Sequence, residues 1–109
     1  MSQALRAFLY GTALRIEASI QDFDSTPTNL IMIDVDSNTV QIYDDQANLV
    51  NTIETGSIIH DGLGEYHVDF QLPSGVIGKW KAVWTATKGS LNSLGAVDFN
   101  VVPVAPVTP

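Results

Sequence analysis

The chain has 109 residues, 45% of them hydrophobic, which is enough for one domain with its own core. Twelve acidic and five basic residues give a net charge of −7, so no basic patch can form, and nucleic acid is excluded as a direct ligand. The sequence contains no cysteine, which excludes disulfides, thiol catalysis and cysteine-based zinc sites.

The N-terminal segment, residues 1–10, fits neither the helical nor the strand period, and we expect an arm or an edge strand there. It lacks the charged start and apolar stretch of a secretory signal. The longest apolar run, Leu30–Ile33, is far shorter than the roughly 20 residues of a membrane helix. We therefore expect cytoplasmic synthesis without membrane insertion. Whether the chain is a complete gene product or an excised domain stays open.

Alternating apolar residues predict the first clear strand, over residues 13–21, with polar residues on its other face. Residues 22–29 contain Pro27 and small polar side chains, which favour a turn. Residues 30–35 are a short buried strand or a loop that tucks Ile31 and Ile33 under the core. Residues 39–43 and 49–53 flank the polar stretch 44–48 and predict a hairpin.

The centre of the predicted core lies in residues 66–72 and 79–87. Large apolar side chains alternate with polar ones in both segments, and Pro73 and Gly78 bound the connection between them. We expect two neighbouring antiparallel strands joined by a loop. The residues expected to point inward are Tyr66, Val68, Phe70, Leu72, Trp80, Ala82, Trp84 and Ala86.

The C-terminal part is predicted to hold a polar loop over residues 88–95 and a last strand over 97–101. Residues 103–109 hold three of the five prolines and are expected to form an extended arm. The predicted division is thus an arm or edge strand at 1–10, a body at 11–102 and a Pro-rich arm at 103–109. Seven to eight short strands with frequent turn signals predict an all-β, antiparallel β-sandwich.

Several stretches together resemble one family of β-sandwich modules: Thr39-Val-Gln-Ile-Tyr-Asp-Asp-Gln-Ala-Asn-Leu-Val50, Gly62-Leu-Gly-Glu-Tyr66, Leu72-Pro73 and Gly78-Lys-Trp-Lys-Ala-Val-Trp84. The layout is similar to the immunoglobulin-like modules, including the macroglobulin-like type, of bacterial, archaeal and phage surface proteins, over roughly residues 12–102. The resemblance implies a single immunoglobulin-like sandwich. It leaves function open, because such modules are spacers, adhesin repeats, carbohydrate-binding units and virion decorations.

Acidic pairs occur in three predicted turns: Asp22 and Asp24, Asp34 and Asp36, and Asp44 and Asp45. Carboxylates in turns can bind calcium, but the ligand spacing of a calcium loop is missing. We interpret these residues as turn caps and surface charges. No metal ligands or cofactors are predicted, although calcium binding stays open.

His60 and His67 are the two histidines, and His67 is expected on the outward side of its strand beside Asp69. No strained nucleophile turn accompanies them, so we interpret them as surface residues and predict no catalytic residue. Trp80 and Trp84 fit a sugar-stacking platform or a core. Because they share a face with Ala82 and Ala86, we favour the core.

These patterns favour a non-enzymatic structural or interaction protein. The leading hypothesis is a component of a phage or virus particle, such as a decoration, head-tail or tail protein, that reaches the virion after cytoplasmic synthesis. Its partners would be further copies of itself or capsid and tail proteins. The alternative is a carbohydrate- or protein-binding module of a secreted or cell-envelope protein. The sequence identifies no binding residues.

Overall fold

The computed structural model describes residues 2–10, 13–23, 30–73 and 77–101. The turn predicted at 22–29 begins too early, because the strand before it continues to Phe23; residues 24–29 and the Pro-rich arm at 103–109 lie outside the described residues. Among the residues that are described, no helix has the length and apolar character needed to span a membrane. Nine strands and one 3₁₀ turn account for most of this part of the chain: β1 Ser2–Tyr10, β2 Ala13–Phe23, β3 Leu30–Met32, β4 Ser37–Tyr43, β5 Leu49–Glu54, η1 Thr55–Ser57, β6 Ile59–Gly62, β7 Glu65–Gln71, β8 Gly78–Lys88 and β9 Leu91–Val101.

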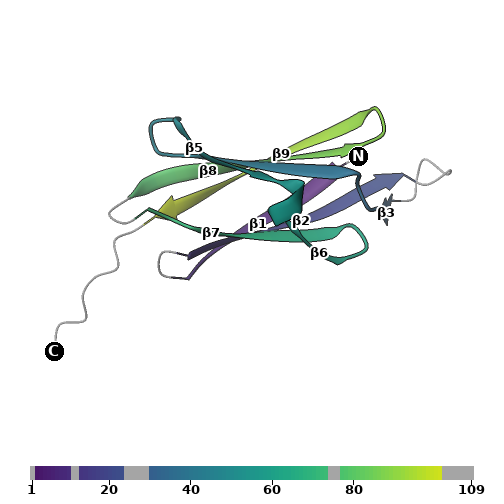
Figure 1. Ribbon diagram of the computed structural model, residues 1–109, viewed down its shortest axis with the longest axis horizontal. Helices are drawn as coiled ribbons and strands as arrows, with labels where there is room; N and C mark the ends of the chain where they lie inside the picture. The colour runs from purple at the N-terminus through teal and green to yellow at the C-terminus, as the bar shows by residue number, and fades with distance from the viewer. Residues whose placement is uncertain (1, 11–12, 24–29, 74–76, 102–109) are drawn as a thin grey trace.

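The strands form two antiparallel sheets, which appear as two layers in Figure 1. Sheet A has the order β1-β2-β7-β6, with β3 added on β2, and sheet B has the order β5-β4-β8-β9. The all-β prediction with antiparallel sheets is confirmed. The predicted count of seven to eight strands is too low, because β3 and β6 have three and four residues and are too short to show a period.

The prediction that residues 66–72 and 79–87 are neighbouring strands of one sheet is wrong. β7 pairs with β2 and β6 in sheet A, whereas β8 pairs with β4 and β9 in sheet B. The chain therefore passes from sheet A to sheet B between Gln71 and Gly78. The two strands contribute to one core from opposite sheets, where their large inner side chains face each other.

The core lies between the sheets and is built from the inward residues that the alternation predicts. Trp84 and Trp80 are 0% and 3% exposed, so their assignment to the core is confirmed. The Trp84 Nε1–H donates a hydrogen bond of 2.8 Å to Oδ1 of the buried Asn38. The other buried apolar residues are Leu14, Ile16, Ala18, Ile20, Val40, Ile42, Ile53, Tyr66, Val68, Leu72, Ala82, Ala86, Phe99 and Val101.

One side of the two layers is closed by β1 of sheet A and β9 of sheet B. Gln3 on β1 donates from Nε2 to the backbone oxygens of Trp84 and Ser93, at 3.2 and 2.7 Å. Its Oε1 is buried and has no hydrogen-bond partner among the described residues. Gly95 allows this approach, since a Cβ there would lie 2.6 Å from Gln3 Oε1 and 3.1 Å from Leu5 Cδ1. Residues 2–10 thus form a full strand whose side chains link the sheets.

Three further expectations are settled by the strand boundaries. The predicted hairpin over residues 39–53 is confirmed by the pairing of β4 with β5. The predicted polar loop at 88–95 is wrong, because β9 starts at Leu91 and pairs back to Lys88, leaving a tight turn. Residues 30–32 form a strand, with Ile31 45% exposed and Ile33 packed against the core.

Candidate binding face

The outer side of sheet B, called here the sheet B face, carries side chains from all four strands. They alternate with buried residues such as Val40, Ile42, Ala82 and Trp84, so they point away from the core. The strand register arranges them in three cross-strand rows, in the order β5, β4, β8, β9: Leu49–Tyr43–Lys81–Asp98, Thr52–Gln41–Val83–Ala96 and Glu54–Thr39–Thr85–Leu94.

The apolar members of these rows form a diagonal across the sheet, called here the apolar stripe. Leu49 and Tyr43 belong to the first row, Val83 and Ala96 to the second, and Leu94 to the third. Leu49 and Leu94 are 53% and 72% exposed, so both ends of the stripe are open to water. Threonine and glutamine side chains fill most of the remaining positions, which makes this face largely uncharged.

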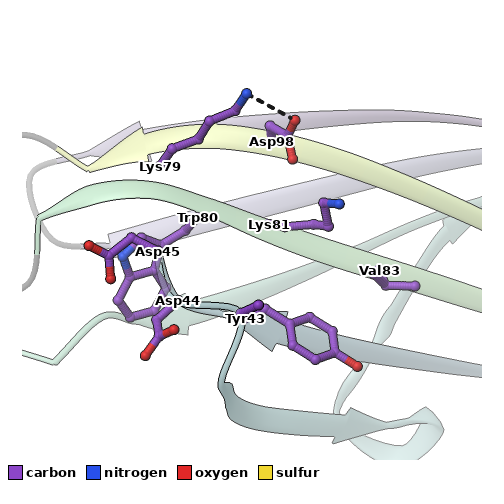
Figure 2. Close-up of a pocket in the computed structure, with 9 residues that line it drawn as sticks. Tyr43, Asp44, Asp45, Lys79, Trp80, Lys81, Val83 and Asp98 are labelled. Atoms are coloured by element: carbon purple, nitrogen blue, oxygen red, sulfur yellow. Dashed lines mark ion pairs between the residues drawn. The ribbon is translucent and has the colours of Figure 1, made fainter.

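An open hollow of about 510 Å³ adjoins the stripe at the end of the sheet that holds the β4–β5 turn. Figure 2 shows Asp44 and Asp45 beside the Trp80 ring at one end of the hollow, and Tyr43 and Val83 toward the other. Its lining residues are Tyr43, Asp44, Asp45, Ala47, Lys79, Trp80, Lys81, Val83 and Asp98.

The β4–β5 turn holds Asp44 in a fixed position. Its Oδ1 accepts hydrogen bonds from the backbone N–H groups of Gln46 and Asn48, both at 2.9 Å. These bonds, with that from Asn48 the strongest, lower the pKa of Asp44 below its ordinary value. Ala47 completes the turn at φ 63°. The interpretation of Asp44 as a turn cap is therefore confirmed.

Two charged groups at the hollow are left without a partner inside the described part of the chain. Lys79 pairs with Asp98 at 3.5 Å, and both side chains are exposed. Lys81 and Asp45 make no ion pair or hydrogen bond with another described residue. Asp45 lies over Gly78, where a Cβ would come within 2.9 Å of its side chain and where φ is +106°. The backbone thus places a carboxylate at the rim that pairs with no other residue of the described ranges.

The outer face of sheet A, by contrast, carries charges that pair with one another. Arg15 binds Asp69 through two hydrogen bonds of 2.8 and 3.2 Å, and Arg6 lies 3.5 Å from Glu17. The hydrogen bond from Arg15 lowers the pKa of Asp69 below its ordinary value. These two pairs link β1 to β2 and β2 to β7 across the outer face of sheet A.

His67 lies at the centre of this paired face. Its Nδ1 is 2.6 Å from Asp61 Oδ2, and its Nε2 is 3.7 Å from Asp69 Oδ2. The residue points outward as predicted but is only 9% exposed, so its interpretation as a surface residue is wrong. Side chains of the adjoining strands cover it, which the sequence of its own strand cannot show.

The acidic pair Asp34 and Asp36 connects turns of both sheets. Asp34 Oδ1 accepts from the Gly64 N–H and contacts His60 Nε2, both at 2.8 Å, and Asp36 Oδ2 accepts from the Gly89 N–H at 2.7 Å. The Gly64 bond is the main cause that lowers the pKa of Asp34 below its ordinary value. The interpretation of Asp34 and Asp36 as caps of their own turn is wrong, because both carboxylates accept N–H groups of turns that are distant in the sequence.

The remaining candidates do not gather into a further site. Asp22 lies on β2, and Asp24 is outside the described residues. Within residues 2–10, 13–23, 30–73 and 77–101, no group of three or more potential metal ligands is found. Sequence analysis named Asp45 as a turn residue and missed Tyr43, Lys81 and Val83 as neighbours of it. They come together only through the register of β4 and β8.

The comparisons with known proteins bear on the fold alone. No model of a protein family matches the chain, and no curated protein matches it. The solved structure of hypothetical protein PH1083 from Pyrococcus horikoshii OT3 is similar, with a TM-score of 0.51 and 12% identity, over 90% of this chain and 85% of that one. At this level of identity the similarity concerns the arrangement of strands.

Proposed function

We propose that the protein is a non-enzymatic structural or interaction protein that binds a protein partner through the sheet B face. The observation that carries this proposal is the exposed apolar stripe, bordered by Lys81 and Asp45 without partners within the described residues. A contiguous apolar strip of this kind is costly to leave in water and gains free energy when a partner covers it.

The proposed setting is a phage or virus particle, in which the chain serves as a decoration, head-tail or tail protein. Its support is the resemblance of residues 12–102 to immunoglobulin-like modules. The two antiparallel sheets are also consistent with a sandwich, which has two layers. The predicted Pro-rich arm at 103–109 would add contacts to neighbouring subunits.

A carbohydrate- or protein-binding module of a secreted or cell-envelope protein is the second candidate. The hollow favours it, because a half-buried tyrosine beside carboxylates and a lysine suits the rings and hydroxyl groups of a saccharide. In this reading Tyr43, rather than Trp80 or Trp84, would contact the sugar, since both tryptophans are buried.

The test compares particles made from a genome that encodes wild-type protein, Val83→Glu or Ala4→Glu. Val83→Glu places a charge in the middle of the apolar stripe, whereas Ala4 is exposed on the outer face of sheet A and provides the matched control. Quantitative mass spectrometry of purified particles should find wild type and Ala4→Glu at equal occupancy and Val83→Glu depleted. Melting curves establish that all three proteins fold.

Full occupancy by folded Val83→Glu would contradict the role of the sheet B face. Absence of the wild-type protein from particles, together with its recovery in the cell-envelope or secreted fraction, would instead favour the second candidate.

A further inference from the structure

We propose that the free edge of β5 binds an extended segment of a partner protein as an added strand of sheet B, and that this segment alternates apolar with polar residues and carries basic residues at its ends. A strand added there lies beside β5 in the plane of the sheet and leaves the apolar stripe uncovered. The inference therefore goes beyond the proposed function of the sheet B face and does not depend on it.

β5 is the outer strand of sheet B on the side of the sandwich opposite to β1 and β9. β1 and β9 lie against each other and are joined by the hydrogen bonds of Gln3. β6, the outer strand of sheet A on the β5 side, has four residues and an irregular register. β5 has six residues, with a regular register from Asn51 to Glu54, and contains neither proline nor lysine, which commonly protect strand edges.

Hydrogen bonds at the end of β4 show which of its backbone groups face β5. The N–H of Asn38 donates to Thr55 Oγ1, and the Thr55 hydroxyl donates to the backbone oxygen of Asn38, both at 2.9 Å. Because Thr55 directly follows β5, the backbone of Asn38 faces that strand. Every second residue of a strand faces the same neighbour, so the backbones of Val40 and Ile42 also face β5.

The register extends this alternation to β5 itself. Ile53 and Asn51 lie opposite the two β4 residues whose backbones face β5, so Ile53 and Asn51 bond to β4. The N–H and C=O groups of Thr52 and Glu54 then face away from β4. The Thr52 N–H donates to Asn51 Oδ1 at 2.9 Å, which agrees with this outward position. Among the described residues no strand pairs with this edge, and an added strand can replace the Asn51 side chain with a backbone oxygen.

The inner side of this edge is apolar. Val50 and Ile58 are partly buried and pack against the core, and Ile53 is 8% exposed. The side chains of an added strand alternate between the two sides of the sheet, so every second residue lies on this inner side. Apolar residues at these positions gain free energy by covering the edge of the core. A segment that alternates apolar with polar residues therefore fits the edge.

The charges around β5 select a basic segment. The hairpin of β4 and β5, residues 37–54, has three acidic residues and no basic one. Asp44 and Asp45 precede β5, and Glu54 ends it. Opposite charges on neighbouring strands attract, whereas like charges repel. A second copy of β5 would bring acidic residues to both ends of the contact, and each copy carries a net charge of −7, so charge disfavours self-pairing along this edge.

Three synthetic hexapeptides with blocked termini test the inference. The first is Lys-Thr-Val-Thr-Val-Lys, the second has Glu in place of both Lys residues, and the third is the first with its four central amides N-methylated. Each is titrated to about 5 mM into nitrogen-15-labelled protein, because a short segment binds weakly. The first peptide should shift the amide resonances of Thr52 and Glu54 saturably. The other two should bind at least about tenfold more weakly.

Variants of the protein locate the contact. Thr52→Pro removes an outward N–H at a position where an edge strand tolerates proline, and should abolish binding of the first peptide. Glu54→Lys should weaken binding of the first peptide and strengthen binding of the second. Val83→Glu, on the sheet B face, is the control and should bind as wild type does. Melting curves establish folding, and Glu54→Lys alone decides the test if Thr52→Pro does not fold.

Equal binding of the first and the N-methylated peptide would overturn the inference, because it would show that backbone pairing is not the contact. So would the absence of saturable shifts in β5, or binding that Val83→Glu abolishes, which would place the peptide on the apolar stripe. Shifts in β5 that depend on protein concentration without peptide would identify a second copy as the occupant instead. None of these results bears on the loss of Val83→Glu from particles, so the proposed function fails separately.

Discussion

The two outer faces of the molecule use their charged side chains in different ways. On sheet A, arginine and histidine side chains contact carboxylates of neighbouring strands, as in the pairs Arg15–Asp69 and His67–Asp61. On sheet B, most outward positions are uncharged, and Lys81 and Asp45 stay unpaired among the described residues. A face whose arginine and histidine side chains are already paired gains less from a partner, whereas an apolar stripe gains free energy from being covered.

The largest expected effect comes from the core that both faces share. Trp84→Ala removes a fully buried ring and its hydrogen bond to Asn38, and should lower the free energy of unfolding by about 3–5 kcal/mol. Lys81→Ala, on the outer side of the same strand, should change it by less than about 0.5 kcal/mol. Denaturant melts measure both values, and equal losses would mean that the two faces of β8 are assigned the wrong way round.

The closed side, where β1 meets β9, provides the next test. Gly95→Ala would place a Cβ 2.6 Å from Gln3 Oε1, and overpacking of this kind costs about 1–3 kcal/mol. The matched control is Gly56→Ala, because no atom lies within 4 Å of the added Cβ. In a Gln3→Ala background, which removes the nearest contact, Gly95→Ala should cost less. An unchanged cost there would show that Gln3 does not link the sheets.

Acid pH should weaken the paired face of sheet A. The Arg15 hydrogen bond lowers the pKa of Asp69 in the folded state, so its stabilisation is complete above the unfolded value near pH 4 and is lost as the pH falls through the folded value. Because the Asp69 side chain is 54% exposed, the contribution is at most about 1 kcal/mol. Asp69→Asn should therefore lower the melting temperature at neutral pH and match wild type in strong acid.

An Arg15→Gln background checks the origin of this effect, because Asp69→Asn should then change the melting temperature much less. A difference between wild type and Asp69→Asn that persists unchanged in strong acid would show that the charge of Asp69 is not its source.

Calcium should have the smallest effect on either face. The described acidic turns use their carboxylates as caps: Asp34 and Asp44 accept backbone N–H groups, and no cluster of three potential ligands occurs among the described residues. Millimolar calcium should therefore shift the melting temperature by no more than about two degrees relative to sodium at equal ionic strength. A saturable rise of several degrees would identify a cation site that the geometry does not reveal.

Alternation along single strands was enough to predict the fold class and the inward positions of β7 and β8. It could not assign these strands to sheets, because Tyr66 and Trp84 bury equally well in one sheet or in two facing ones. The apolar stripe could not be predicted for a related reason. Tyr43, Val83 and Leu94 are apolar residues at outward positions of three strands, and only the register reveals that they adjoin. Burial of His67 likewise depends on its cross-strand neighbours.

The central claim is that the sheet B face is covered by a partner, and the three lysines of the chain allow a direct measurement. Lys79 and Lys81 lie at this face, whereas Lys88 lies at the β8–β9 turn. Amine-reactive labelling with mass spectrometry should compare the free protein with the protein in assembled particles. We predict strong protection of Lys81, weaker protection of Lys79 and unchanged labelling of Lys88. Equal labelling of Lys81 in both states would contradict the claim.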